Sequence, residues 1–382
     1  MIELLEPVSE EILNFSTSLS EYALGQKIIK NCRNEFPDID AVQIALITVE
    51  DNRGNDELLP TDFTNFRKQF YSLFPGNWKV VMADLGTIKQ GETLQDTYFL
   101  VKSITEMLLK NNTIPLVVGG TQDLTYPLYR SYDDLDQMVN LVAIDSVFDF
   151  QRTGGTLASG YLNRIISEEP NNLLNFANLG YQSFYNPQEE VDLIEKLYFE
   201  SYRLGEVSSD LSVAEPVLRD ADIVSVDLNA IESSYLNSTS HFQPNGFTGK
   251  EVCGLSRYAG ISDKVSSFGV FNFKSTLQSD VLVAQMLWYF IEGFAHRSFD
   301  YPFESKKDYL RYTVPIEEDE DMVFYKSPKS GRWWIEISNY SKAHNKYKKH
   351  TLLPCSESDY LQAIDQQIPE RWWKAIRKEL IL

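Results

Sequence analysis

Three short polar segments each follow an apolar run, and they hold the residues of this chain that are best suited to chemistry. They are Gly119-Gly-Thr-Gln-Asp123, Asp145-Ser-Val-Phe-Asp149 and Asp227-Leu-Asn229. If these segments meet in one cleft, their carboxylate and amide oxygens suit a hard cation such as Mg²⁺, Ca²⁺ or Mn²⁺. A second interpretation stays open, because acidic residues after strands also cap helices and form turns.

The runs before these segments are short, β-branched and apolar on both faces, which is typical of parallel strands covered by helices. We predict strands at residues 43–49, 78–83, 114–118, 139–144, 223–226 and 267–271. Between them, apolar residues recur at steps of three and four, as in Phe63, Phe66 and Phe70, and predict amphipathic helices. Strands that alternate with helices predict an α/β fold, in which ligands gather at the carboxyl ends of the strands.

In these segments the chain resembles the ureohydrolases, the family of arginase, agmatinase and formimidoylglutamase. The family signatures Gly-Gly-Asp-His, Asp-Ala-His-x-Asp and Ser-x-Asp-x-Asp correspond here to Gly119-Gly-Thr-Gln122, Asp145-Ser-Val-Phe-Asp149 and Ser225-Val-Asp-Leu-Asn229. The resemblance runs from about residue 40 to 298, and Phe148 makes it nearest to the formimidoylglutamase branch. It implies an arginase-like, three-layer α-β-α fold with a mostly parallel central sheet.

The resemblance also implies a chemistry, which this sequence departs from. The family uses two manganese ions, held by two histidines and four aspartates, to activate a bridging water. At the six matching positions stand Gln122, Asp145, Val147, Asp149, Asp227 and Asn229. Three aspartates remain, whereas Gln122 and Val147 replace the histidines and Asn229 replaces one aspartate. We therefore interpret these positions as a degraded metal site.

The substrate pocket of the family is altered as well. The substrate-binding Glu of the family precedes a Val-Asn-Pro segment, and the corresponding stretch here is Val270-Phe-Asn-Phe273, without a carboxylate. Val270 and Asn163 are predicted remnants of that pocket. All four histidines lie beyond the first two motif segments, and His241 is the one whose loop could approach the cleft.

Three aspartates in one concave site repel each other, so without a cation at least one should be protonated or paired. Arg152 is a candidate partner. We predict that no cofactor is bound, and the alternative is one Mg²⁺, Ca²⁺ or Mn²⁺ ion at Asp145, Asp149 and Asp227.

The resemblance ends near residue 299, which predicts an arginase-like domain over residues 1–300 and a C-terminal extension over 301–382, packed on it. Within the extension we predict a β-hairpin from strands at 322–326 and 332–337, and a terminal helix over 368–380. Four of the six tryptophans lie here, and they are Trp333, Trp334, Trp372 and Trp373. Tryptophans often anchor protein interfaces, so these four form a candidate partner surface. The alternative is that they pack the extension onto the main domain or a subunit boundary.

The composition limits the partners. The formal charge is −20, from 55 acidic and 35 basic residues, and it disfavours nucleic acid and anionic membrane. The three cysteines are far apart, and the longest apolar run, at 281–291, is about half a membrane span. We therefore predict a cytoplasmic protein with no membrane insertion.

Two functional hypotheses follow from these observations. The favoured one is a non-catalytic protein that acts by binding a small ligand, a protein partner or further copies of itself. The other is a metal-dependent hydrolase of amidino or formimidoyl C–N bonds.

Overall fold

The structure, a computed structural model, describes residues 2–33, 35–135, 137–150, 155–237, 242–302, 306–316, 321–337 and 352–379. Arg152 and His241, which the sequence analysis singled out, lie outside these ranges.

The described residues form a central sheet of ten strands, in the order β1-β4-β3-β5-β10-β9-β6-β7-β8, with β2 paired to β4. Only the β1–β4 pair is antiparallel among the strand pairs of this sheet. The strands are β1 (Leu5–Glu6), β2 (Ile29–Lys30), β3 (Ile44–Val49), β4 (Met82–Ile88), β5 (Ile114–Val118), β6 (Val139–Ile144), β7 (Leu173–Tyr181), β8 (Glu200–Arg203), β9 (Ile223–Asp227) and β10 (Ser267–Phe271).

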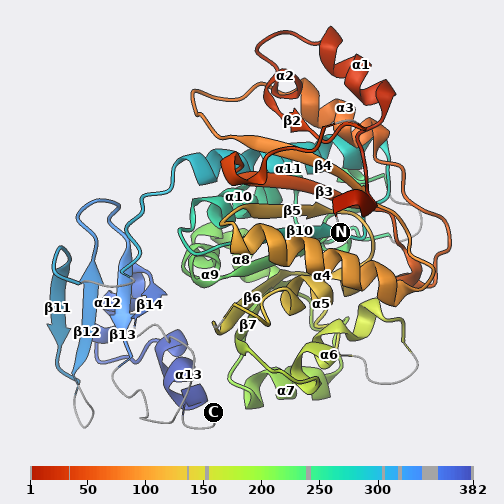
Figure 1. The fold of residues 1–382 in the computed structure, drawn as a ribbon. Coiled ribbons are helices and arrows are strands. Elements are labelled where there is room, and N and C mark those ends of the chain that lie inside the picture. The colour runs from red at the N-terminus through yellow and green to blue at the C-terminus, as the bar shows by residue number, and fades with distance from the viewer. Residues whose placement is uncertain are drawn as a thin grey trace.

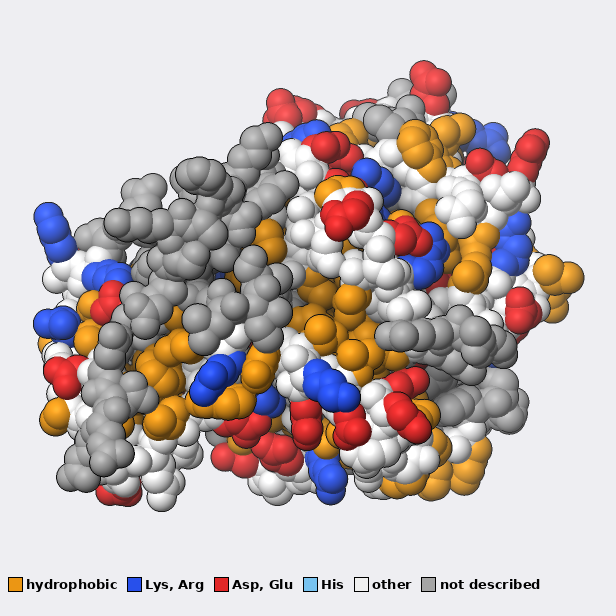
Figure 2. Space-filling model, turned by 90° about the horizontal axis from the view of Figure 1, so that it is seen from below, with side chains coloured by type: hydrophobic (Ala, Val, Ile, Leu, Met, Phe, Trp, Pro, Cys, Tyr) orange, Lys and Arg blue, Asp and Glu red, His pale blue; other side chains and the backbone are white. Residues whose placement is uncertain are grey.

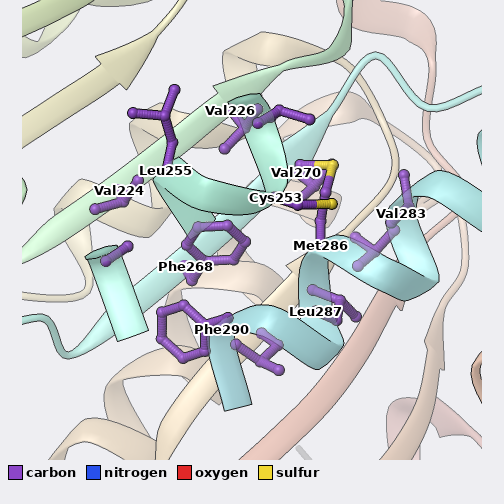
Figure 3. Packing of buried hydrophobic residues seen from close by; sticks show 14 of the residues in the cluster. Val224, Val226, Cys253, Leu255, Phe268, Val270, Val283, Met286, Leu287 and Phe290 are labelled. Carbon is purple, nitrogen blue, oxygen red and sulfur yellow. The ribbon is translucent and has the colours of Figure 1, made fainter. Parts of the chain in front are cut away.

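Helices cover both faces of the sheet (Figure 1). One layer contains α1 (Glu10–Ser18), α2 (Leu24–Lys27), α3 (Thr64–Ser72), α8 (Leu204–Ser209), α9 (Ala214–Asp220), α10 (Gly249–Ile261) and α11 (Leu277–Ala295). The other contains α4 (Leu94–Lys110), α5 (Thr125–Arg130), α6 (Tyr161–Ser167) and α7 (Gln188–Lys196). Figure 3 shows how α10 and α11 pack on β9 and β10. The predicted three-layer α-β-α fold with a mostly parallel sheet is confirmed.

Short 3-10 helices occupy several of the connections. They are η1 (Ile2–Leu4), η2 (Ile39–Ala41), η3 (Arg53–Asn55), η4 (Gln122–Leu124), η5 (Ala158–Gly160), η6 (Leu211–Val213), η7 (Leu228–Ala230) and η8 (Ser233–Tyr235). Two of them lie where the sequence places its polar segments: η7 begins directly after β9, and η4 follows β5 after residues 119–121.

The predicted strands agree with the observed ones except at β4. The predictions at 114–118 and 139–144 coincide with β5 and β6. The prediction at 78–83 is wrong in position, because it shares only Met82 and Ala83 with β4. β4 continues through Asp84 and Gly86, which the apolar pattern does not predict. The charged Asp84 is tolerated inside the strand because its buried carboxylate is paired with Arg67 at 2.8 Å.

The C-terminal extension forms a separate antiparallel sheet, in the order β11-β12-β13-β14, on one side of the molecule (Figure 1). It contains β11 (Leu310–Val314), β12 (Met322–Lys326), β13 (Trp333–Glu336), β14 (Leu352–Cys355), α12 (Glu357–Ile364) and α13 (Glu370–Glu379). The structure thus contains the predicted hairpin, as β12 and β13, and the predicted terminal helix, as α13. Because this sheet has its own apolar clusters, we propose that residues 1–300 and 301–382 are two domains.

The tryptophans do not form the predicted partner surface. Trp333 and Trp334 point to opposite faces of the small sheet, as neighbours in a strand must, but both faces are covered. Trp334 is fully buried, with the Arg219 guanidinium 4.6 Å from its ring centre. Trp372 is also buried, and only Trp373 is substantially exposed, at 40%. The prediction is therefore wrong for three of the four, because they pack the extension together and onto α9.

Among the described residues, no helix is both long and apolar enough to span a membrane. Viewed from below, the surface shows apolar side chains between groups of acidic and basic ones (Figure 2).

Candidate functional site

The three polar segments lie at the same edge of the central sheet, because β5, β6 and β9 are parallel and end there. Strands β6 and β9 are neighbours, which brings Asp145 and Asp227 side by side. Strand β10 lies between β5 and β9, but Gln122 bridges this gap by donating from Nε2 to Ser225 Oγ at 3.0 Å. The three predicted segments therefore converge at one edge of the sheet.

Two glycines shape the segment after β5. Gly119 and Gly120 adopt φ values of +97° and +72°, which strain any other residue. A Cβ on Gly119 would lie 2.8 Å from the carbonyl oxygen of Val49, and one on Gly120 would lie 2.8 Å from that of Asp51. This tight turn begins η4 and buries Gln122 in the site.

The segment after β6 is held by two asparagines. Asn186 accepts a hydrogen bond from Phe148 N at 2.9 Å and donates to Ser146 O at 3.0 Å. Asn178 donates to Val147 O, also at 3.0 Å. Sequence reasoning did not assign this role to either residue, because asparagines this far along the chain carry no local signal. They fix the position of the two carboxylates that flank the segment.

Both interpretations of the strand-end aspartates hold in part. Asp145 Oδ1 accepts from Val147 N at 3.0 Å, and Asp227 Oδ1 accepts from Asn229 N at 2.7 Å, so each forms a local turn. Asp145 Oδ2, however, is buried and accepts no hydrogen bond. One oxygen of Asp145 thus supports the loop, and the other faces the site.

Burial and mutual repulsion favour the neutral forms of these acids. Burial, followed by the charges of Asp227 and Asp149, raises the pKa of Asp145 well above its ordinary value. The pKa of Asp149 is raised as well, first by burial and then by Asp227. Asp145 and Asp149 raise and lower each other's pKa directly, so at least one of the two should carry a proton unless a cation neutralises the pair.

A tyrosine that sequence reasoning missed completes the site. Tyr161, the first residue of α6, is fully buried and lies close to the carboxylates. Burial, and then the charges of Asp149 and Asp145, raise the pKa of its phenol well above the ordinary value, so the phenol stays protonated. Its protonated phenol can donate a hydrogen bond toward the acids, and no motif in the sequence marks it.

The remaining predicted residues are less central. Val147 and Asn229 are half-buried at the site, and Asn163 is half-buried on α6. Val270 is fully buried, and its role as a pocket remnant stays a prediction. Its partner in β9 is Val226, whereas Asp227 is paired with Phe271, and side chains alternate between faces along a strand. Val270 lies in the apolar core with α10 and α11 (Figure 3).

The donors at this site do not fit a pair of manganese ions. No imidazole lies among them in the described ranges, where His296 is the one histidine and lies at the end of α11. The described residues also contain no group of three or more His, Cys, Asp or Glu arranged to hold a metal. Three buried oxygens, Gln122 Oε1, Asp145 Oδ2 and Asp149 Oδ2, nevertheless accept no hydrogen bond. Their chemistry suits a single hard cation better than a transition-metal pair.

Fold and site together define a class, the ureohydrolase-type α/β proteins with polar loops over the carboxyl edge of a parallel sheet. The sequence model of the Arginase family matches residues 63–291, more than half of the chain, and the chain belongs to this family. A comparison with curated protein sequences finds no match.

Solved structures with the same fold include a formiminoglutamase, a formimidoylglutamase and an agmatine ureohydrolase. Formiminoglutamase from Trypanosoma cruzi, solved with Mn²⁺, is 20% identical with a TM-score of 0.61, over 67% of this chain and 94% of that one. Formimidoylglutamase from Bacillus subtilis is 16% identical with a TM-score of 0.62, over 69% and 91%. Agmatine ureohydrolase from Thermoplasma volcanium is 17% identical with a TM-score of 0.57, over 74% and 97%. At these identities the likeness concerns the fold, and it agrees with the predicted ureohydrolase resemblance.

Proposed function

We propose that this arginase-family protein does not hydrolyse amidines through a manganese pair, and that it acts by binding a small ligand or a protein partner. One observation carries the proposal, namely the donor set at the strand ends. Val147 offers no donor atom, and Gln122 and Asn229 offer neutral amides where the family has an imidazole and a carboxylate.

The expected loss of metal affinity is large. Removing a group that merely supports a metal ligand weakens binding about tenfold to hundredfold. Three direct ligands are replaced here, so we expect a loss of more than about a thousandfold, or about 4 kcal/mol. A carboxylate pair that carries a proton lowers the affinity further, because a cation must displace that proton.

Activity assays test the proposal. The purified protein, supplied with Mn²⁺, should release neither urea nor formamide from amidino and formimidoyl substrates. Restoring the family ligands with Gln122→His, Val147→His and Asn229→Asp together should increase manganese uptake. A matched variant with Gln122→Asn, Val147→Leu and Asn229→Gln should not. Turnover by the unaltered chain that stops on chelation of metal would refute the proposal.

A second candidate rests on the unpaired buried oxygens. One Mg²⁺, Ca²⁺ or Mn²⁺ ion could be held by Gln122 Oε1, Asp145 Oδ2 and Asp149 Oδ2 together. The alternative function would then be a metal-dependent hydrolase. Calorimetric titration with each ion decides this. Binding at one ion per chain that Asp149→Asn abolishes supports the candidate, and the absence of heat from all three ions rejects it.

The composition supports a cytoplasmic location and does not favour nucleic acid as a partner. Fractionation of cells that express the tagged chain checks the first point.

A further inference from the structure

A cavity lies at the edge of the central sheet opposite the aspartate site, where the C-terminal extension meets the main domain. It has a volume of about 60 Å³ and is partly open to solvent. Its walls come from the starts of β6, β7 and β8 on one side and from β14 and α13 on the other. It is therefore separate from the aspartate site, which lies at the carboxyl ends of the strands.

Four basic side chains and two acidic ones line this cavity, and they are Lys264, Arg371, Lys374, Lys378, Glu200 and Asp220. Three of the basic groups have carboxylates of their own. Lys264 is 3.3 Å from Asp220 and 3.4 Å from Asp222, Arg371 is 2.6 Å from Glu200, and Lys374 is 2.7 Å from Glu370.

Lys378 is the exception. It is half-buried. No carboxylate of the described residues lies within 4.0 Å of its Nζ, and the nearest acidic charges, Glu200 and Asp220, act on it from farther away. Its ammonium donates to Asn175 Oδ1, a neutral acceptor. A partly desolvated ammonium that lacks a direct ion pair favours an anion beside it, so an anion in this cavity would be stabilised.

A second polar atom in the same cavity lacks a partner. Asn140 is buried, and its Nδ2 donates to Asp220 O at 3.0 Å, but its Oδ1 accepts no hydrogen bond. The rest of the wall is apolar and includes Leu174, Leu353 and Ala375. The cavity thus offers a positive group, an acceptor in need of a donor, and an apolar wall.

We propose that this cavity binds a short-chain carboxylate, with its carboxylate at Lys378 and its alkyl part against Leu174 and Leu353. A volume of about 60 Å³ holds about four water molecules, which matches an acid of two or three carbons. A hydroxyl on the acid can donate to Asn140 Oδ1. Inorganic phosphate shares the charge, but its oxygens would leave the apolar wall unused.

The test compares sodium propionate, lactate, phosphate and chloride at equal ionic strength, with calorimetry and thermal unfolding of the full chain as readouts. We expect both carboxylates to bind at one per chain. Lactate should bind about threefold to tenfold more tightly than propionate, because it differs by one hydroxyl that can make one hydrogen bond. A response to phosphate alone would refute the carboxylate assignment. Equal responses to all four salts would indicate an unspecific salt effect and refute the proposed binding site.

Variants locate the binding. Lys378→Met should abolish the carboxylate response, and Arg377→Met, one residue earlier on the same helix, should preserve it. If Lys378→Met fails to fold, Ala375→Asp serves instead, because it places a carboxylate in the cavity. That variant should raise the unfolding temperature without added salt and remove the response to propionate. A carboxylate response that persists in Lys378→Met or in Ala375→Asp would place the binding elsewhere and refute the inference.

Discussion

The ion pair between Glu200 and Arg371 joins the edge strand β8 to the last helix α13, and breaking it should weaken the docking of the extension. Arg371 Nε lies 2.6 Å from Glu200 Oε2, and Arg371 also donates to Pro354 O. The side chains are 11% and 6% exposed, so the pair is largely shielded from water. The change to make is Arg371→Met, which keeps much of the apolar volume and removes the charge.

The size of the effect follows from the acidity of Glu200. Burial alone would raise its pKa, but the charge and hydrogen bonds of Arg371, helped by Lys378 and Tyr202, lower the pKa from 4.5 to about 2. At about 1.4 kcal/mol per pH unit, this difference corresponds to about 3 kcal/mol. Loss of one partner of a buried ion pair independently suggests about 3–5 kcal/mol. We therefore expect Arg371→Met to lower the free energy of unfolding by about 3 kcal/mol at pH 7.

The pH dependence gives a second readout. Because the pKa of Glu200 is lower in the folded state, its contribution is present above about pH 4.5 and is lost as the pH falls toward about 2. Urea unfolding, followed by circular dichroism between pH 7 and pH 3, should show this loss in the unaltered chain and much less of it in Arg371→Met. Arg377→Met, on an exposed position of the same helix, should match the unaltered chain. A destabilisation below about 1 kcal/mol, or an unchanged acid dependence in Arg371→Met, would refute the reasoning.

Three further predictions concern the site and the core. Gly119→Ala should destabilise the protein by more than about 2 kcal/mol, because the residue has φ +97° and its Cβ would meet Val49 O; urea unfolding measures this. Trp334→Ala should cost about 3–5 kcal/mol and Trp373→Ala less than about 1 kcal/mol, since one ring is fully buried and the other is 40% exposed; equal losses would contradict the assignment. Asp145→Asn should raise the unfolding temperature in the presence of chelator, because it removes an acid that burial and its neighbours disfavour; a lower temperature would indicate that the carboxylate has a favourable partner.

Much of the fold could be predicted because buried parallel strands have a simple pattern. Strands β5 and β6 are continuous apolar runs, and both were predicted to the residue. Strand β7 was missed because Asn175 and Asn178 interrupt its apolar pattern. In the extension, β14 was missed because it contains Pro354, which occurs at edge strands and disfavours a strand prediction.

The site was predictable only where motifs carry it. The convergence of Gln122, Asp145 and Asp227 follows from parallel strands that end at one edge. The position of Tyr161 beside the acids depends on how α6 packs, and no local pattern encodes that. The burial of the tryptophans was not predictable for the same reason. Helices α9 and α13 cover the small sheet, and they lie far from Trp334 in the sequence.

Manganese stoichiometry tests the central claim most directly. The chain is purified with Mn²⁺ present, freed of unbound ions by gel filtration, and measured by elemental mass spectrometry. A site with Gln122 and Val147 in place of imidazoles predicts far less than one manganese ion per chain. Two tightly held manganese ions per chain would contradict that prediction and favour the alternative function, a metal-dependent hydrolase.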